Sequence, residues 1–450
     1  MFPPTRRSVL AAALAIPTLG LAACSRGGPA PGQAPTPVTD AEFQQAMDTE
    51  TELTFWTWTP DIQKEVDLFR QAYPKIGVNV VNAGQGQAEY TKLRTVLRAG
   101  RGAPDVVQLE FQFLPSFLLG DNLLDLSGSR GYSDLQQLYP EWVWQQVSRG
   151  SGIYAVPQDT GPLGLLYRDD LFTQAGVAPP GTWDEFATAA QAYRAAIPDS
   201  YLTNFAPGQP GQFIGLMWAN GAQPFAYDGD RTVSIDFSSE QVTSVASYWQ
   251  QLIAEDLVAI DPDFTDQWYQ GLNRGTYATW LAAAWGPVFL SGSAESTAGK
   301  WRAAQLPQFD AGSTATGNWG GSTNAVIATT DQPIAAAELA RWINVEKEPA
   351  TMFATEQLLF PPSSTVLEDP SFLTQAPDFY GGQEVNRVFA EASENVNATF
   401  QWLPFMDYAF SSYTDVVAAA IVDRGDLVAA LASWESRMKD YATEQGFTVR

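Results

Sequence analysis

Strand-like runs alternate with amphipathic helical runs in the first part of the chain, and this alternation constrains the fold more than any other feature. Residues 52–58, 77–81 and 105–109 are rich in β-branched and aromatic residues. Between them, apolar residues recur every three or four positions over 62–73 and 90–97, which is typical of helices with one buried face. Thr59 and Pro60 are expected to begin the first of these helices as N-cap and first residue, and Gly100 to end the second. This βαβαβ order predicts an α/β fold with a parallel sheet and helices on its faces.

A second α/β unit is predicted to start near Gly161. Residues 163–167 resemble a strand, and Thr182 to Glu185 form a capping box that opens a helix. Further strands are predicted at 275–285 and 323–329, and further helices at 333–345, 416–421 and 427–441. The chain is therefore expected to contain two units rather than one.

Composition excludes several functional classes. The chain has 450 residues, with 25 basic and 50 acidic side chains and a formal net charge of −25, so its surface would repel nucleic acid. It has no His and one Cys, which excludes Ser-His and Cys-His relays, imidazole metal sites and intrachain disulfides. These exclusions remove a nucleic-acid partner and much of enzyme chemistry. We also expect no cofactor, no bound metal and no catalytic residues.

The N-terminus has the pattern of an export signal followed by a lipid anchor. Arg6 and Arg7 precede an apolar run that ends at Leu21-Ala22-Ala23-Cys24. The run is shorter than the roughly 20 residues that span a membrane, and its end resembles a bacterial lipobox. We expect residues 1–23 to be a twin-arginine-like signal peptide and Cys24 to be lipidated. The alternative is an ordinary signal peptide with a chance Cys.

The residues after Cys24 are predicted to form a tether. Glycines accompany the prolines of this segment, Pro29, Pro31, Pro35 and Pro37, so we assign residues 24–49 to a Pro/Gly-rich tether. No later segment is apolar for long enough to span a bilayer. The expected location is the extracytoplasmic face of a bacterial cell membrane, with the lipid as the only membrane contact.

Several stretches occur in an order that resembles one protein family. They are residues 53–58 with 69–74, residues 102–107 with 123–126, residues 153–157 with 167–172 and 180–186, and Trp319-Gly320-Gly321 before the helix at 333. Together they resemble the extracellular solute-binding proteins of ABC importers, in the carbohydrate-binding branch related to maltose-binding protein.

This resemblance implies a two-lobed periplasmic-binding-protein type II fold, with a ligand cleft between lobes joined by several hinge crossings. We place the crossings near Asp159, Lys300 and Glu348. The N-terminal lobe would be 50–158 plus 302–348, and the C-terminal lobe 159–301 plus 349–450. The implied partner is the ABC permease, which receives a solute from a monomeric receptor after the lobes close by hinge motion.

A sugar presents apolar C–H faces and a rim of hydroxyls, so its site needs aromatic faces and planar polar groups. The aromatic candidates end strands or lie beside Gly and Pro, and they are Trp56, Trp58, Trp218, Trp285, Trp319 and Trp402, with Trp280 beside them. The polar and backbone candidates are Gln85, Gln87, Glu110, Asp159, Asn220 and Gly320. The structural alternatives are that each Trp packs in the core and that each carboxylate forms a hydrogen bond in the hinge or at a helix cap.

The ligand class follows from the scarcity of basic residues near these stretches, where Arg274 is the nearest in sequence. An anionic ligand would need Arg or Lys, so a neutral sugar or oligosaccharide is favoured. A glycerol phosphodiester or another polar solute remains an alternative. So do a secreted glycoside hydrolase that uses Glu110 and Asp159, and a surface adhesion module.

Overall fold

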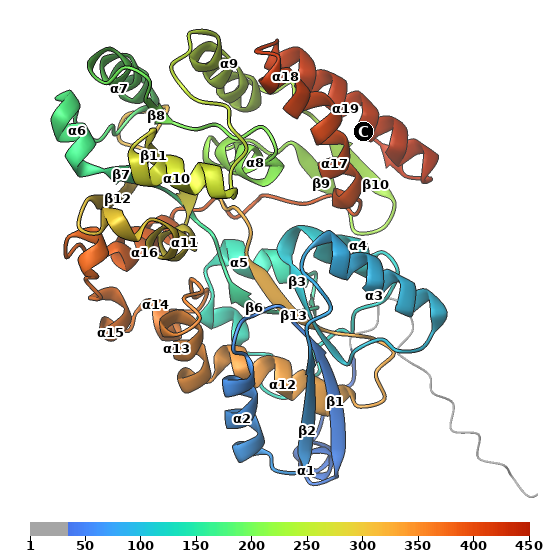
Figure 1. Ribbon diagram of the computed structural model, residues 1–450. Coiled ribbons are helices and arrows are strands. Elements are labelled where there is room, and N and C mark those ends of the chain that lie inside the picture. Colours follow the sequence, from blue (N-terminus) through green and yellow to red (C-terminus); the bar gives the residue numbers. More distant parts are fainter. Residues whose placement is uncertain (1–34) are drawn as a thin grey trace, which may run out of the picture.

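The structure is a computed structural model that describes residues 35–450. Two α/β lobes lie one above the other, each built around its own sheet (Figure 1). The predicted signal peptide, Cys24 and the first part of the tether lie outside the described residues. Within residues 35–450, no helix combines the length and the apolar character that a bilayer crossing requires.

The N-terminal lobe contains a five-stranded sheet in the order β2-β1-β3-β13-β6. Its strands are β1 (Thr51–Trp56), β2 (Ile76–Val81), β3 (Val106–Glu110), β6 (Val156–Asp159) and β13 (Ser322–Val326). β1 pairs in parallel with β2 and β3, as the βαβαβ pattern predicts. β13 arrives from the later part of the chain and pairs antiparallel with β3 and β6.

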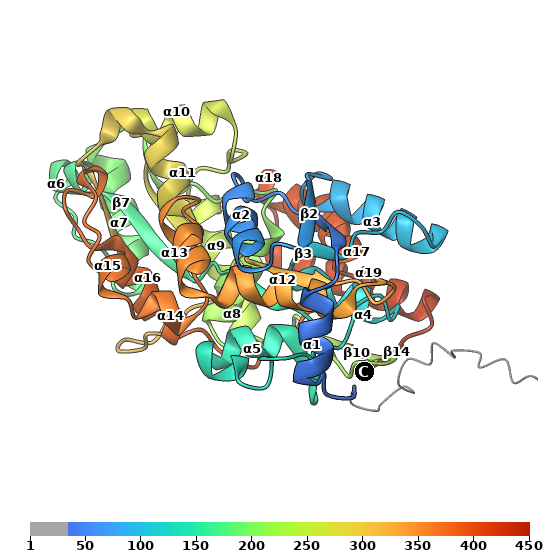
Figure 2. The same cartoon turned by 90° about the horizontal axis from the view of Figure 1, so that it is seen from below.

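Helices cover this sheet. α12 (Pro333–Val345) contacts β3, β6 and β13, and α2 (Gln63–Ala72) packs against both β2 and α12. Figure 2 shows α1 and α2 beside α12. The remaining helices of this lobe are α1 (Asp40–Met47), α3 (Gln87–Ala99), α4 (Leu114–Leu118) and α5 (Glu141–Val147), with a short β4–β5 ribbon (Ser148–Arg149 and Gly152–Ile153).

The C-terminal lobe contains a four-stranded sheet in the order β12-β7-β11-β8 and a three-stranded sheet in the order β14-β10-β9. The first comprises β7 (Leu163–Arg168), β8 (Tyr201–Thr203), β11 (Tyr277–Ala283) and β12 (Trp301–Gln305). The second comprises β9 (Phe225–Tyr227), β10 (Thr232–Ile235) and β14 (Thr448–Val449). The edge of β12 is covered by the side-chain amide of Gln383, which bonds both the N–H and the C=O of Ala303 at 2.7 and 2.8 Å.

The helices of the C-terminal lobe surround both sheets. They are α6 (Asp169–Ala175), α7 (Trp183–Ala196), α8 (Pro210–Ala219), α9 (Glu240–Ala254), α10 (Asp266–Arg274), α11 (Gly286–Ser293), α16 (Val385–Glu394), α17 (Met406–Tyr413), α18 (Ala419–Val422) and α19 (Leu427–Glu444). A π-helical turn at Thr414–Ala418 joins α17 to α18, so the helix predicted at 416–421 is part of a longer run. α13 (Lys347–Thr355), α14 (Ser364–Leu367) and α15 (Pro370–Leu373) follow α12 on the way back to this lobe.

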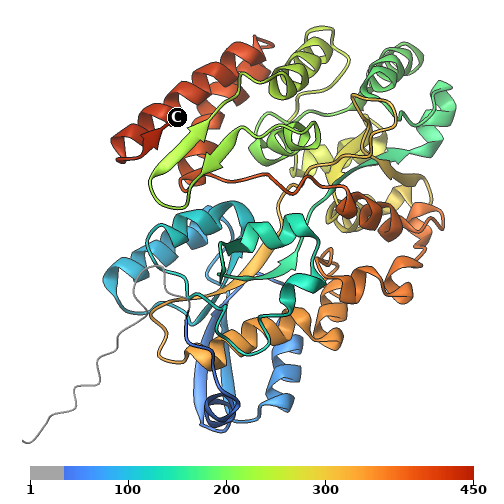
Figure 3. The same cartoon turned by 180° about the vertical axis from the view of Figure 1, so that it is seen from behind.

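The chain passes between the lobes in segments that lie side by side. β6 leads through Thr160 to β7, and the Gly161 N–H donates to Asn318 Oδ1 at 2.8 Å in the return segment between β12 and β13. The Thr160 N–H donates to the Phe360 carbonyl at 3.0 Å in a third segment. Gly320 and Gly321 have φ of +78° and +92°, a conformation that glycine adopts without strain. Figure 3 shows the connections from behind.

The structure differs from two predicted boundaries. β12 pairs antiparallel with β7, so residues 302–305 belong to the second sheet and the return crossing lies nearer Gly320 than Lys300. Residues 40–47, which we assigned to the tether, form α1, because Thr39 and Glu42 make a capping box and Phe43 and Met47 are buried. The sequence predicts no strand at 301–305, so the crossing was placed before this segment, and the preceding Pro and Gly residues obscured the short helix.

Candidate functional site

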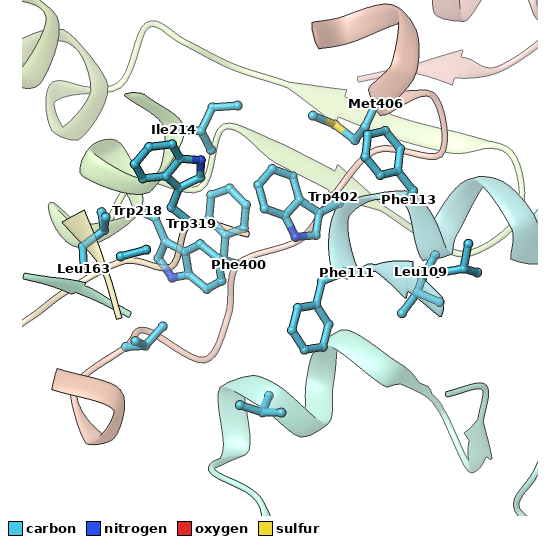
Figure 4. Packing of buried hydrophobic residues seen from close by; sticks show 14 of the residues in the cluster. Leu109, Phe111, Phe113, Leu163, Ile214, Trp218, Trp319, Phe400, Trp402 and Met406 are labelled. Carbon is cyan, nitrogen blue, oxygen red and sulfur yellow. The ribbon is translucent and has the colours of Figure 1, made fainter. Parts of the chain in front are cut away.

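A cavity of about 480 Å³ lies between the lobes, and we call it the Glu110 cavity. The residues that line it come from both lobes and from the crossing, and they are Gly86, Gln87, Glu110, Gln112, Phe113, Gly208, Gln209, Pro210, Gly211, Asn318, Trp319, Gly320, Trp402, Asp407, Phe410 and Ser411. Figure 4 shows Trp402 between Trp319 and Phe113, three of the aromatic residues that line the cavity. The cavity therefore combines aromatic surfaces with carboxylates and amides.

The fold gathers polar groups at this place for a topological reason. β3 ends at Glu110, at the carboxyl edge of the parallel strands, where α/β sheets bind ligands. The first residues of α3, α8 and α17 also border the cavity, at Gln87, Pro210 and Asp407 respectively. Helix N-termini carry unpaired N–H groups and partial positive charge, which favours carboxylates and hydroxyl oxygens there.

Glu110 is fixed by a neighbouring tyrosine. The Tyr90 hydroxyl donates to Glu110 Oε2 at 2.9 Å and accepts from the Glu110 N–H at 3.2 Å. Burial raises the pKa of Glu110 to about 7, and the carboxylates of Asp159 and Asp407 act in the same direction, against hydrogen bonds from Tyr90 and Gln112. Its side chain can therefore accept or donate a hydrogen bond near neutral pH.

Asp407 lies on the opposite wall and is paired across the cleft. Its Oδ2 forms an ion pair with the guanidinium of Arg94 on α3, so the pair joins the two lobes. Burial raises the pKa of Asp407, and the effect of burial exceeds the opposing effect of Arg94. Oδ1 of Asp407 is buried and accepts no hydrogen bond of normal geometry from the described residues, although Gln87 lies close enough to lower the pKa of this carboxyl group, so Oδ1 is an acceptor available to a ligand.

Two tryptophans form the aromatic part of the wall. The backbone N–H of Trp319 donates to the Gly161 carbonyl at 2.8 Å. The Trp319 ring lies so close to Gly211 that a Cβ at position 211 would be 2.8 Å from the ring. Trp402 is buried, and its indole N–H has no partner within residues 35–450. A ligand hydroxyl would satisfy this donor, which a protein interior normally pairs.

The predicted site residues divide into three groups. Glu110, Trp319, Gly320 and Trp402 line the cavity. Gln87 also lines it, whereas Gln85, two residues earlier in the chain, is exposed and does not.

The second group lies beside the cavity. Trp58 packs its ring against Tyr90 at 6.5 Å, and Trp56 is partly buried at the end of β1. Trp285 donates from its indole N–H to the Trp319 carbonyl at 3.0 Å, and the two ring centroids are 4.9 Å apart. These residues support the wall rather than form it.

The third group differs from the prediction. Asp159 accepts hydrogen bonds from the backbone N–H of Ser322 at 3.0 Å and from the Ser322 hydroxyl. Its carboxylate therefore holds the crossing together rather than facing the cavity. Trp218 is 1 % exposed and stacks on Phe400 at 4.2 Å, so it is core, as is Trp280. Asn220 donates to the Gln241 carbonyl at 2.8 Å on the outer surface of the second lobe. α8 faces the cavity with its N-terminus, whereas Trp218 and Asn220 lie at its other end.

Sequence reasoning missed part of the lining, namely Gln112, Phe113, Gln209, Asp407, Phe410, Ser411 and the partner Arg94. Gln209 directly precedes Pro210, a typical first helical residue, and that pattern was available in the sequence. Arg94 reaches Asp407 over a separation of 313 residues, so no local pattern could reveal the pair.

A second interlobe cavity of about 520 Å³ shares Trp402 with the first, and we call it the Tyr154 cavity. Its polar lining residues are largely bonded within the protein. Gln146 donates to the Phe400 carbonyl at 2.9 Å, and Arg149 donates to the Gly229 carbonyl at 3.0 Å while stacking on Tyr227. These contacts brace one lobe against the other.

Comparisons with known proteins agree with this architecture. The family model described as bacterial extracellular solute-binding protein matches residues 56–348. The lactose-binding protein of Rhizobium radiobacter is 27% identical over 371 residues, covering 76% of this chain and 81% of that protein. The arabinooligosaccharide-binding protein of Halalkalibacterium halodurans is 22% identical over 395 residues, covering 82% and 85% of the two chains.

Two solved structures share the fold. The ABC transporter associated binding protein from B. animalis subsp. lactis Bl-04, solved with β-1,6-galactobiose, is 30% identical with a TM-score of 0.77, covering 90% of this chain and 100% of that chain. The galacto-N-biose/lacto-N-biose I-binding protein of Bifidobacterium longum has a TM-score of 0.78 at 24% identity and the same coverage. The chain therefore belongs to the bacterial extracellular solute-binding proteins, a family of receptors rather than enzymes.

Proposed function

We propose that this chain is a lipid-anchored extracytoplasmic receptor that binds a neutral sugar or oligosaccharide in the Glu110 cavity and delivers it to an ABC importer. The observation that carries the proposal is the composition of the cavity. Two carboxyl groups, at Glu110 and Asp407, face a space that Trp319 and Trp402 also line. Carboxylates accept strong hydrogen bonds from hydroxyls, and aromatic faces cover the C–H surfaces of a sugar ring.

The charge of the cavity favours a neutral ligand. The described lining residues include no Lys or Arg, and the nearby Arg94 is already paired with Asp407. A phosphodiester would face two carboxylates without a free cation, and like charges in a poorly solvated site are costly. The alternative of a glycerol phosphodiester therefore lacks a group to recognise the phosphate.

Relatives support the same ligand class. A relative that is 30% identical was solved with β-1,6-galactobiose, and others are named for binding lactose and arabinooligosaccharides. The location follows from the lipobox-like sequence that ends at Cys24, and one relative from Streptomyces antibioticus is named a lipoprotein. The permease partner follows from the ABC transporter to which the relative with galactobiose belongs.

Function as a receptor requires that ligand favour the closed arrangement of the lobes. A solute that contacts Glu110 on one lobe and Asp407 on the other binds better when both walls are close. Delivery would then follow because the permease recognises the closed form. The receptor performs no chemistry in this scheme.

A calorimetric screen tests the proposal. The mature protein is titrated with neutral mono-, di- and oligosaccharides, including lactose and β-1,6-galactobiose, and with glycerophosphodiesters. At least one neutral sugar should bind and raise the melting temperature, since ligand at 100 times its Kd adds about 2.7 kcal/mol. Binding of a phosphodiester alone would contradict the ligand class.

The anchor has a separate test. Replacement Cys24→Ser should release the protein from membranes into the medium, because the acyl chains could not be attached. Retention of the variant on membranes would contradict lipidation at Cys24.

A further inference from the structure

Two exposed phenylalanine side chains flank the same tryptophan. Phe264 is 36 % exposed and Phe289 is 50 % exposed, and both pack against Trp285 with ring centroids 6.0 and 5.6 Å away. Scattered exposed phenylalanines need no explanation, but a contiguous group does. We call Phe264, Trp285 and Phe289 the aromatic ramp.

The ramp is continuous with the Glu110 cavity. Trp319 lines the cavity, and its ring lies 4.9 Å from that of Trp285 and 6.1 Å from that of Phe264. Gln209 also lines the cavity and donates to Asp263 Oδ1 at 2.8 Å, which ties the loop that carries Phe264 to the cavity wall. Aromatic rings thus lead from the enclosed space to solvent without interruption.

The backbone at Phe264 is strained. Its φ is +52°, in the left-handed region that a bulky residue rarely adopts. Such strain persists where the surrounding structure enforces it, and it concentrates at functional sites. Phe264 directly precedes Thr265, the N-cap of α10, and packs on Trp268 at 5.6 Å, so it also resembles a hydrophobic staple. A staple needs neither the left-handed backbone nor the exposed ring.

We propose that the aromatic ramp binds the outer rings of an oligosaccharide whose inner part occupies the Glu110 cavity. The inference rests on the proposed function and narrows its ligand to a neutral oligosaccharide that is longer than the cavity can enclose. Flat aromatic surfaces match the C–H faces of successive sugar rings, and partial exposure leaves room for them to stack. Continuity with the cavity through Trp319 identifies the occupant as the same ligand rather than a separate molecule.

Chain-length dependence of affinity tests this proposal. Calorimetry would compare α-1,4-gluco-, β-1,6-galacto- and α-1,5-arabino-oligosaccharides of one to four rings. We expect Phe289→Ala to lower the affinity for the longest binding member of a series about 5- to 10-fold, on the scale of one lost aromatic contact. The loss for the shortest binding member should be clearly smaller.

Phe264→Gly separates binding from folding. Glycine adopts the φ of this position freely, so the substitution removes the ring together with the backbone strain. The melting temperature should hold while the affinity for long ligands falls as in Phe289→Ala. A large drop in melting temperature would identify Phe264 as a staple, and Phe289→Ala would then decide alone. Phe309→Ala, an exposed phenylalanine on the same lobe, is the matched control and should bind every sugar as the parent does.

The outcomes separate the two proposals. Equal losses at all chain lengths, or no loss, would overturn the ramp while sugar binding stands. Unchanged sugar affinities would leave the exposed rings as a surface for a protein partner. If no sugar of any series binds the parent protein, the proposed function fails and the ramp fails with it.

Discussion

The two interlobe cavities have similar volumes, about 480 and 520 Å³, but different chemistry. In the Glu110 cavity, Oδ1 of Asp407 accepts no hydrogen bond from the described residues, whereas the unpaired indole N–H of Trp402 borders both cavities. In the Tyr154 cavity, Gln146 and Arg149 donate to backbone carbonyls of the other lobe. Contacts that join the lobes border both cavities, since Arg94 pairs with Asp407 at the Glu110 cavity, but only the Glu110 cavity adds, among the described residues, a buried acceptor without a partner.

Because the two volumes are similar, the unsatisfied polar groups rather than the volume favour the Glu110 cavity as the ligand site. Buried polar groups are almost always hydrogen-bonded in proteins, so a group that is not bonded indicates an absent partner. Position supports the same choice, because the strand end at Glu110 and the helix starts at Pro210 and Asp407 surround the first cavity. We therefore expect the two cavities to respond differently to substitution.

The largest difference is expected between Glu110→Ala and Gln145→Ala. The first removes a buried hydrogen-bonding carboxyl group from the Glu110 cavity, and sugar affinity should fall about 100-fold, the scale of a lost charge-assisted hydrogen bond. Gln145 lines the Tyr154 cavity, and its loss should change affinity less than about twofold because the ligand does not enter there. Calorimetric Kd values measure both. Similar losses would mean that the cavities do not differ as described.

An intermediate effect is expected from the two arginines that join the lobes. Arg94→Ala leaves Asp407 buried without its cation, so more of this carboxyl is protonated and it accepts hydrogen bonds less well. Sugar affinity should fall about 10-fold, on the scale of one weakened hydrogen bond to the ligand.

Arg149→Ala provides the matched comparison. It removes a bond to the Gly229 carbonyl beside the Tyr154 cavity, and it should lower the melting temperature slightly while sugar affinity changes less than in Arg94→Ala. A larger loss of affinity in Arg149→Ala than in Arg94→Ala would indicate that the ligand binds in the Tyr154 cavity and not in the Glu110 cavity.

Much of the local structure follows from the sequence, and the long-range pairing does not. The capping box at Thr182 begins α7 as predicted, and α3 ends at Gly100 as predicted, because these signals act within one helical turn. The expected N-cap at Thr59 is wrong. Its hydroxyl bonds Gln108 and Gln158 from distant strands, and α2 begins instead at Gln63.

The candidate site could be predicted only in part for the same reason. Glu110 was found because it follows the predicted strand at 105–109, and Trp319 because two glycines follow it. Trp218 was chosen because residues 218–221 resemble a loop beside a cleft, whereas Trp218 lies at the C-terminal end of α8 and the N-terminus of this helix borders the cavity. The Arg94–Asp407 pair depends on how two lobes dock, which no local pattern encodes.

The smallest expected effect is a pH dependence that belongs to the Glu110 cavity. Burial raises the pKa of Glu110 to about 7, so the folded state holds this proton more tightly than the unfolded chain. The resulting stability is present at low pH and is lost as pH rises toward and through 7. The parent melting temperature should therefore fall between pH 5 and pH 8, and Glu110→Gln should reduce that fall by about 1–2 °C. A steeper fall in the variant would have the wrong sign.

The most direct test of the central claim is a crystal structure of the complex with the tightest neutral sugar from the calorimetric screen. The account predicts a sugar ring in the Glu110 cavity, with hydroxyls bonded to Glu110 and Asp407 and a C–H face against Trp319. A sugar in the Tyr154 cavity, or on the outer surface of either lobe, would contradict it.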